Sequence, residues 1–306
     1  MSKISYLFIG LLLACICIFE MVSVINLDVQ IYICAVLISL LGIPHGAIDH
    51  VIYRQERSTS QFVFYSSYFG LMILYFILWM YFPAFSMIAF LCLSAFHFGQ
   101  SQFSCVGVSR QWKKITLYFA WGLSILSGLV IYNYAEISVF VITNPDLIDV
   151  IPAFHYTSYI VVLLASTVAT IFVLGNLYMA KEVSSHFLLK EIALFGLIHL
   201  CFFILPLLVG FTLYFCTLHS MQVLTEEFGY LKRRMSQFSI YNFIKLLTPY
   251  SLISIVGIGI LLFLSNTEII AIPGDLLIFI MISILTLPHS IVMDNFYFKS
   301  AKYLKY

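Results

Sequence analysis

Ten stretches of mostly apolar residues, each long enough to cross a lipid bilayer, follow one another along this chain of 306 residues. A membrane-spanning helix needs about 20 such residues, and a helix satisfies its backbone hydrogen bonds within its own segment. The stretches lie near residues 5–26, 31–52, 62–82, 85–103, 114–132, 158–180, 187–206, 208–226, 243–264 and 276–297. The seventh and eighth form one apolar run, which we divide around Pro206 and Gly210 because a single helix there would be far too long.

The sequence therefore predicts an all-α fold, a polytopic transmembrane helix bundle that forms a single integral-membrane domain over residues 1–306. An eight-span arrangement, with one helix pair re-entrant, remains an alternative. The longest segment between spans, residues 133–157, contains Asn144-Pro145-Asp146 and Pro152, which favour an ordered loop.

Composition places the chain in the membrane rather than in water. Hydrophobic residues make up 62% of it and charged residues only 9%, with a mean hydropathy of +1.03, whereas a soluble domain carries about a quarter charged residues. The net charge is +1 and no basic patch is evident, which argues against a nucleic-acid partner. We expect a multi-pass protein of the cell membrane whose surroundings are the lipid bilayer.

The distribution of charge tests the number of spans. With ten spans and a cytoplasmic N-terminus, all 15 Lys and Arg residues fall on the inner side. The outer connections carry only acids, namely Asp28, Glu136, Asp146, Asp149, Glu268 and Asp275. Cytoplasmic loops are normally rich in Lys and Arg, so the pattern predicts that both termini are cytoplasmic.

Four histidines lie inside apolar spans. His45, His97, His219 and His289 belong to the second, fourth, eighth and tenth predicted spans, which all run in the same direction. Each follows the start of its span by a similar number of residues, and a helix rises about 1.5 Å per residue. The four imidazoles are therefore expected in one thin layer, which is the arrangement that a metal site in a helix bundle needs.

Other interpretations of these histidines remain open. A membrane histidine can also hydrogen-bond a neighbouring backbone carbonyl, and imidazole ligands suit iron, zinc or copper equally well. Asp49 follows His45 by four residues, so on an α-helix it would share a face with His45 and orient it or bind the metal directly. The remaining histidines are weaker candidates: His50 points elsewhere, His199 lies on a span of opposite direction, and His155 and His186 lie at loops or interfaces.

The segments around these histidines are GIPHGAIDH, AFHFG, YFCTLHS and LPHSIVMD. Together they resemble the Brp/Blh family of membrane β-carotene 15,15′-dioxygenases, from the second span to the last. The resemblance implies cleavage of β-carotene by O2 at the central double bond, giving two molecules of retinal, at a non-haem iron (Fe2+). It implies that His45, His97 and His219 are iron ligands.

The resemblance assigns the other candidates less firmly. His289 matches a family histidine whose role is less defined. Asp49, Asp294 and Gln222 would hydrogen-bond to the ligating histidines or complete the metal site as ligands. The family also suggests that a retinal-binding rhodopsin uses the product.

Two positions depart from the family pattern. Val223 stands where the family usually has a second histidine four residues after the one matching His219, and Gln102 stands where it usually has an aspartate. A dioxygenase acting on another carotenoid or isoprenoid, or an inactive carotenoid- or retinal-binding homologue, therefore remains an alternative. A transporter is disfavoured because acidic residues are lacking mid-membrane, apart from Glu20 and the inner-end Asp49 and Asp294.

Overall fold

The computed structural model of the protein describes residues 3–22, 25–56, 60–144 and 155–300, and within these ranges it contains helices and no strand. The α-helices are α1 (Lys3–Met21), α2 (Leu27–Leu37), α3 (Asp49–Glu56), α4 (Gln61–Tyr81), α5 (Pro83–Phe103), α6 (Gln111–Tyr132), α7 (Tyr134–Thr143), α8 (Tyr156–Met179), α9 (Ser185–Ile204), α10 (Leu207–Leu213), α11 (Met221–Arg234), α12 (Ile240–Asn266) and α13 (Gly274–Ser300). Three shorter helices of other types are η1 (Ile38–Gly42), η2 (Ile43–Gly46) and η4 (Tyr214–Ser220).

Ten helical segments of the described chain are long and apolar enough to cross a membrane, so the predicted polytopic bundle is confirmed. Their bounds follow the apolar runs closely, and the division at Pro206 is correct because α9 ends at Ile204 and α10 begins at Leu207. The eighth span is the main difference, since it continues through α11 to Arg234 instead of ending at residue 226. The added residues 227–234 include Glu227 and the basic residues 232–234, and these charges interrupt the apolar run.

The segment between the fifth and sixth spans is partly helical rather than only a loop. Helix α7 occupies Tyr134–Thr143, directly after α6. Residues 145–154, with Asp146, Asp149 and Pro152, lie outside the described residues, as do Arg57, Lys302 and Lys305.

Two of the spans are not uniform α-helices. In the second span, α2 passes into the π-helix η1 and then into the 3₁₀-helix η2. Pro44, inside η2, has no N–H to donate, which favours a change of helix type there. In the eighth span, α10 passes into the π-helix η4 before α11 resumes the α-helical pattern. Short π-helical segments of this kind often occur at functional sites.

Helices α5 and α6 pack backbone against backbone. A Cβ added at Gly99 of α5 would overlap the backbone carbonyl of Tyr118, and one added at Gly122 of α6 would overlap that of Ala95. Small residues allow membrane helices to approach this closely. The contact fixes the position of α5, which carries His97 between Ala95 and Gly99.

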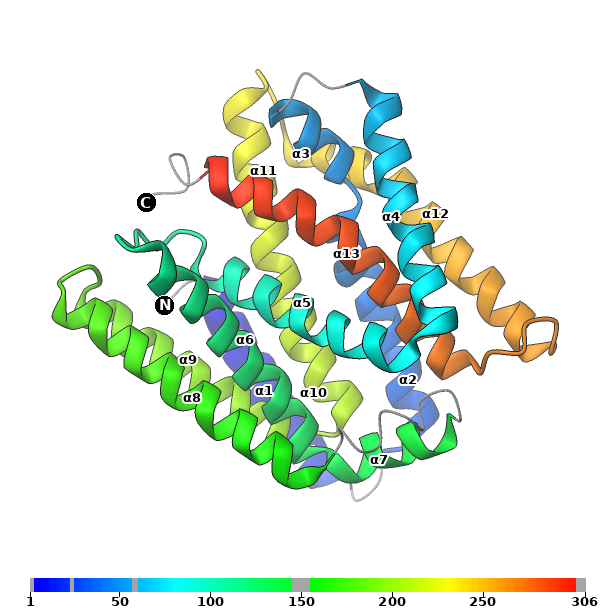
Figure 1. Ribbon diagram of the computed structural model, residues 1–306, viewed down its shortest axis with the longest axis horizontal. Coiled ribbons are helices and arrows are strands. Elements are labelled where there is room, and N and C mark those ends of the chain that lie inside the picture. Colours follow the sequence, from blue (N-terminus) through cyan, green and yellow to red (C-terminus); the bar gives the residue numbers. More distant parts are fainter. Residues whose placement is uncertain (1–2, 23–24, 57–59, 145–154, 301–306) are drawn as a thin grey trace.

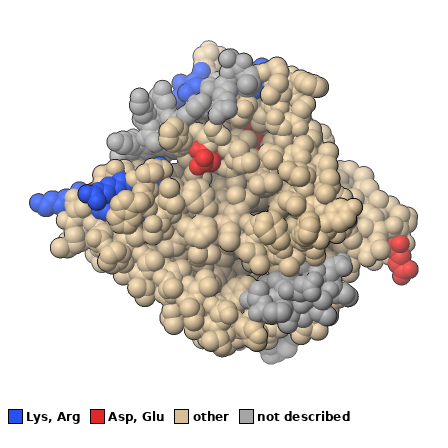
Figure 2. Space-filling view, viewed as in Figure 1, with Lys and Arg blue, Asp and Glu red and all other residues tan. Residues whose placement is uncertain are grey.

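The first and last described helices have their chain ends on the same side of the molecule (Figure 1). On the face shown in Figure 2, the Lys and Arg side chains gather on that side together with some acidic atoms, and a further acidic side chain lies at the opposite end, where no Lys or Arg is visible. This distribution is the one expected for ten spans and a positive inner side. Helices α5, α13 and the eighth span meet in the middle of the bundle (Figure 1).

Candidate metal centre

The four membrane histidines come from four different helical segments. His45 lies in the 3₁₀-helix η2, His97 in α5, His219 in the π-helix η4 and His289 in α13. His97, His219 and His289 are 2%, 3% and 5% exposed, whereas His45 is partly exposed. The layer expected from the topology is therefore present, and His45 alone of the four is appreciably accessible.

The four imidazoles form a closed ring. Neighbouring ring centroids lie 4.8 Å apart for His45 and His289, 5.1 Å for His289 and His97, 5.1 Å for His97 and His219, and 5.2 Å for His219 and His45. All four pairs are edge to face, with angles between the ring planes of 78° to 89°. One ring nitrogen from each of His45, His97 and His289 lies within 4.8 Å of the others, which is close enough to hold one metal ion.

Hydrogen bonds on the outside of the ring fix the orientation of two imidazoles. Nδ1 of His45 contacts the carbonyl of Gly42. Nδ1 of His219 lies 3.0 Å from the hydroxyl of Ser101, and that hydroxyl donates its own proton to the carbonyl of Phe98 at 2.9 Å. The Ser101 oxygen is therefore the acceptor, and in both histidines the proton sits on Nδ1 while Nε2 keeps a free lone pair.

A carboxylate orients a third imidazole. Nδ1 of His289 lies 3.0 Å and 3.1 Å from the two carboxylate oxygens of Asp49. The hydroxyl of Tyr68 donates to the same carboxylate at 2.9 Å. A ligating histidine usually donates its second N–H to a carboxylate or a carbonyl in this way, which raises the basicity of the free nitrogen.

The nitrogens that remain have no partner of their own. Within the described residues, both ring nitrogens of His97 and Nε2 of His219 and His289 are buried without a hydrogen bond. A buried polar group left unpaired costs roughly 1–3 kcal/mol. Several such nitrogens converging from one ring match the donor set of an imidazole-bound transition metal, so the residues present fit a metal.

Asp49 supports a different histidine from the one expected. The prediction that Asp49 and His45 share a helix face assumes an α-helix between them, but η2 is a 3₁₀-helix and a turn at residues 47–48 precedes α3. The carboxylate is consequently directed at His289.

The other two supporting candidates lie farther from the ring. Asp294 is exposed and accepts a hydrogen bond from Gln100 at 2.7 Å, and no hydrogen bond to a histidine is found for it in the described part of the chain. Gln222 donates to the backbone carbonyl of Ser101 at 2.9 Å, and the hydroxyl of the same serine contacts His219.

The two departures from the family pattern have clear local surroundings. Val223 has no exposed surface and belongs to an apolar cluster with Ile48 and Met293. Gln102 donates to Glu191 of α9 at 2.6 Å.

Neither His50 nor His199 joins the ring. His50 packs between Tyr65 and Tyr250, and His199 contacts Ser124 and Tyr132.

Three buried glutamates escaped the sequence analysis, namely Glu191, which accepts the hydrogen bond of Gln102, and Glu226 and Glu227 of α11. Glu226 is buried and receives hydrogen bonds from Ser104 and Gln222, each at 3.3 Å. Glu227 is completely buried, and neither of its oxygens has a hydrogen-bond partner within the described residues. Glu226 and Glu227 lie at the α11 end of the eighth span, and the prediction of few acids mid-membrane did not name them. These two buried glutamates could have been found from the continuation of the eighth span as far as the basic residues 232–234.

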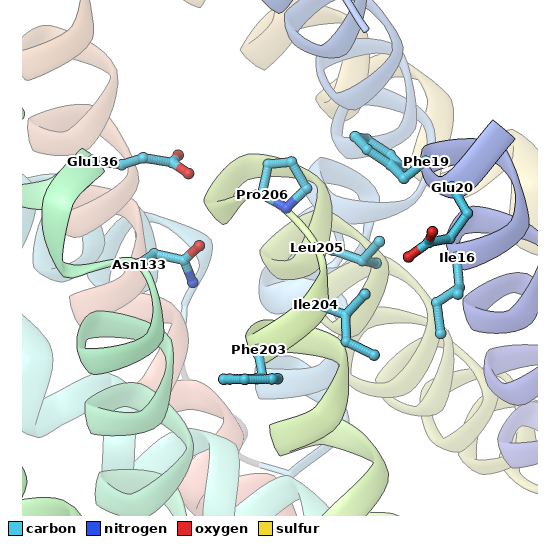
Figure 3. A pocket seen from close by; sticks show the side chains of 9 residues that line it. All are labelled: Ile16, Phe19, Glu20, Asn133, Glu136, Phe203, Ile204, Leu205 and Pro206. Carbon is cyan, nitrogen blue, oxygen red and sulfur yellow. The ribbon is translucent and has the colours of Figure 1, made fainter. Parts of the chain in front are cut away.

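A pocket of about 410 Å³ opens away from this centre, at the end of α1 and the junctions α6–α7 and α9–α10. Figure 3 shows Glu20 and Glu136 on opposite sides of it, with Pro206 between them. No histidine lines the pocket.

The chain is similar to known proteins over most of its length. A family model described as beta-carotene 15,15'-dioxygenase matches residues 36–297, which include all four histidines of the ring. A protein of the uncultured marine bacterium 66A03, named beta-carotene 15,15'-dioxygenase, is 28% identical over 270 residues, covering 84% of this chain and 90% of that relative. No solved structure matches the chain.

Proposed function

Because this chain belongs to the beta-carotene 15,15'-dioxygenase family, we propose that it cleaves β-carotene, or a closely related carotenoid, with O2 at the central double bond. The observation that carries the proposal is the closed ring of four imidazoles whose unpartnered nitrogens converge within the bundle. A carotenoid is apolar and dissolves in the lipid bilayer that surrounds such a bundle.

His45, His97 and His289 would hold an iron ion, with His219 beside them as the fourth donor. Bound iron would supply the redox chemistry that O2 requires to react with an alkene. Imidazole ligands alone do not select iron over zinc or copper, so the choice of iron rests on the family.

The surrounding residues position the imidazoles. Gly42, Ser101 and Asp49 each accept the Nδ1 proton of one histidine, which leaves the opposite nitrogen directed inward. Cleavage adds both atoms of O2 to one double bond and yields two aldehydes, so no proton enters or leaves and no general base is required. The protein's part is to orient the double bond and to exclude water.

The cleavage reaction is tested in a bacterial host that makes β-carotene. We expect expression of the protein to deplete β-carotene and to produce retinal, both measured by chromatography. Unchanged β-carotene, with the protein present in the membrane fraction, would overturn the proposal for this substrate. Hosts that make other carotenoids then test the wider substrate class.

The metal centre is tested by analysis of iron, zinc and copper in the purified protein. We expect His97→Ala and His289→Ala to lose most of the iron, because each removes a converging nitrogen. His199→Ala is the matched control, since His199 lies in a span but contacts Ser124 and Tyr132. Equal iron in all three variants would exclude the histidine ring as the iron site.

A second candidate function is suggested by Val223, which cannot ligate a metal. A homologue without the cleavage reaction would bind a carotenoid or retinal and release it unchanged. In that case the protein would be purified with a bound pigment while β-carotene in the host stays intact.

A further inference from the structure

Three aromatic rings form a stacked column that ends at the histidine ring. Phe211, Phe215 and His219 are spaced by four residues along α10 and η4. The ring centroids of Phe211 and Phe215 lie 5.3 Å apart with planes 11° from parallel, and those of Phe215 and His219 lie 5.5 Å apart with planes 19° from parallel. Because stacked rings cover one another's faces, the outer side of this column consists of the edges of the rings.

The column is accessible at its two phenyl rings, whereas His219 at its end is buried. Phe211 and Phe215 are partly exposed, in contrast to the buried Tyr214 and Leu218 between and beyond them. Phe215 also contacts the edge of His45, with ring centroids 5.5 Å apart. Since His45 is the one partly exposed member of the histidine ring, the accessible aromatic surface and the accessible histidine adjoin each other.

Gly42 makes room for this arrangement. A Cβ at this position would lie 2.8 Å from Cε1 of Phe215, so any larger residue would push the phenyl ring aside. The carbonyl of Gly42 also accepts a hydrogen bond from Nδ1 of His45. One residue of the π-helix η1 thus fixes both the histidine and the phenyl ring next to it.

We propose that Phe211 and Phe215 form the subsite that binds one conjugated arm of the substrate, and that Phe215 determines which double bond reaches the histidine ring. The inference rests on the proposed function, because it takes the ligand to be a long, flat polyene from the bilayer. Aromatic rings favour edge-to-face contact with other π systems, and the edges of a column that ends at His219 align such a chain with the centre.

The test replaces the phenyl rings by an apolar side chain without a π face. Phe215→Leu and Phe211→Leu are compared with Phe172→Leu, which changes a phenylalanine of α8 that is 64% exposed. Loss of an aromatic contact corresponds to an increase of about two- to ten-fold in KM for the polyene. We expect this increase at both positions, a mixture of cleavage products for Phe215→Leu, and wild-type iron content in all three variants.

An unchanged KM and an unchanged single cleavage position in Phe215→Leu would overturn the subsite. Failure of the proposed function gives a different result, since wild-type protein would then form no cleavage product. The subsite is still tested in that case by the absorbance of carotenoid retained during purification. Wild-type retention by Phe215→Leu would reject the subsite, and reduced retention by it but not by Phe172→Leu would support the subsite.

Discussion

The carboxylate of Asp49 lies 3.0 Å from Nδ1 of His289, although 240 positions separate the two residues in the sequence. The contact joins the second span to the last one directly behind the histidine ring. Tyr68 of α4 donates to the same carboxylate, so three spans determine the orientation of one imidazole. Such partners of ligating histidines contribute to metal affinity without touching the metal.

Asp49→Asn is expected to weaken the metal centre while the protein remains folded. The amide keeps the size of the side chain but removes the charge that stabilises the Nδ1 proton of His289. Loss of a partner of this kind typically costs about 10–100-fold in metal affinity or activity. Iron titration and the rate of carotenoid cleavage measure the effect. Asp28→Asn, an exposed carboxylate of the same span, serves as the control. Equal iron affinity in the two variants would refute the role of Asp49.

Val223→His tests whether the missing family histidine can be restored. Val223 is completely buried among apolar side chains, including Ile48 and Met293. Overpacking a core costs about 1–3 kcal/mol, and the imidazole would bring a polar group without a partner. We therefore expect a lower melting temperature and no increase in bound iron. Val223→Leu separates the effect of size from that of polarity. A gain in iron content for Val223→His would show instead that the position faces the metal.

The helical spans could be predicted from the sequence because hydrocarbon imposes a minimum length on every crossing segment. The apolar runs match the observed spans within a few residues, except where α11 continues to Arg234. That extension contains Glu227 and the basic residues 232–234, which end the apolar run. Whether a charged residue is buried depends on the helices that pack against it. A count of apolar residues along one segment contains no information on those helices.

The histidine layer could also be predicted, since depth in the membrane follows from span direction and position. The partners of the histidines could not. Asp49 was assigned to His45 by α-helical spacing, which the 3₁₀ geometry of η2 invalidates. Ser101 and Tyr68 carry no signal in the sequence, because their roles depend on how α5 and α4 pack against η4 and α3. The aromatic column was hidden for the same reason among the 29 phenylalanines of the chain.

Glu182, between α8 and α9, gives a pH-dependent contact outside the spans. The backbone N–H of Ser109 donates to its carboxylate at 2.8 Å, the Ser109 hydroxyl at 2.9 Å and Nζ of Lys113 at 3.3 Å. These hydrogen bonds, that of the Ser109 backbone first, hold the pKa of Glu182 below its ordinary value.

A depressed carboxyl pKa contributes stability above the unfolded-state pKa, and this stability is lost as the pH falls through the folded-state pKa. We expect Glu182→Gln to lower the melting temperature slightly at pH 7. The difference from wild type should shrink as the pH falls below the ordinary glutamate pKa of about 4.3. The exposed Glu268 provides the control Glu268→Gln. A difference that persists unchanged at low pH would contradict an ionic role for Glu182.

Gly122→Ala and Gly99→Ala test whether the close packing of α5 and α6 positions His97. Each added methyl group would overlap a backbone carbonyl of the opposite helix, so the two helices must separate. We expect a loss of stability of at least about 1–3 kcal/mol, typical of overpacking, together with reduced iron content because α5 carries His97. Thermal denaturation and metal analysis measure the two effects.

Gly70→Ala and Gly175→Ala are matched controls, since no atom lies within 4 Å of the added methyl group. Alanine favours a helix by about 1 kcal/mol over glycine, so both controls should be at least as stable as wild type. If Gly122→Ala retains wild-type stability and iron, the α5–α6 contact does not determine the position of His97.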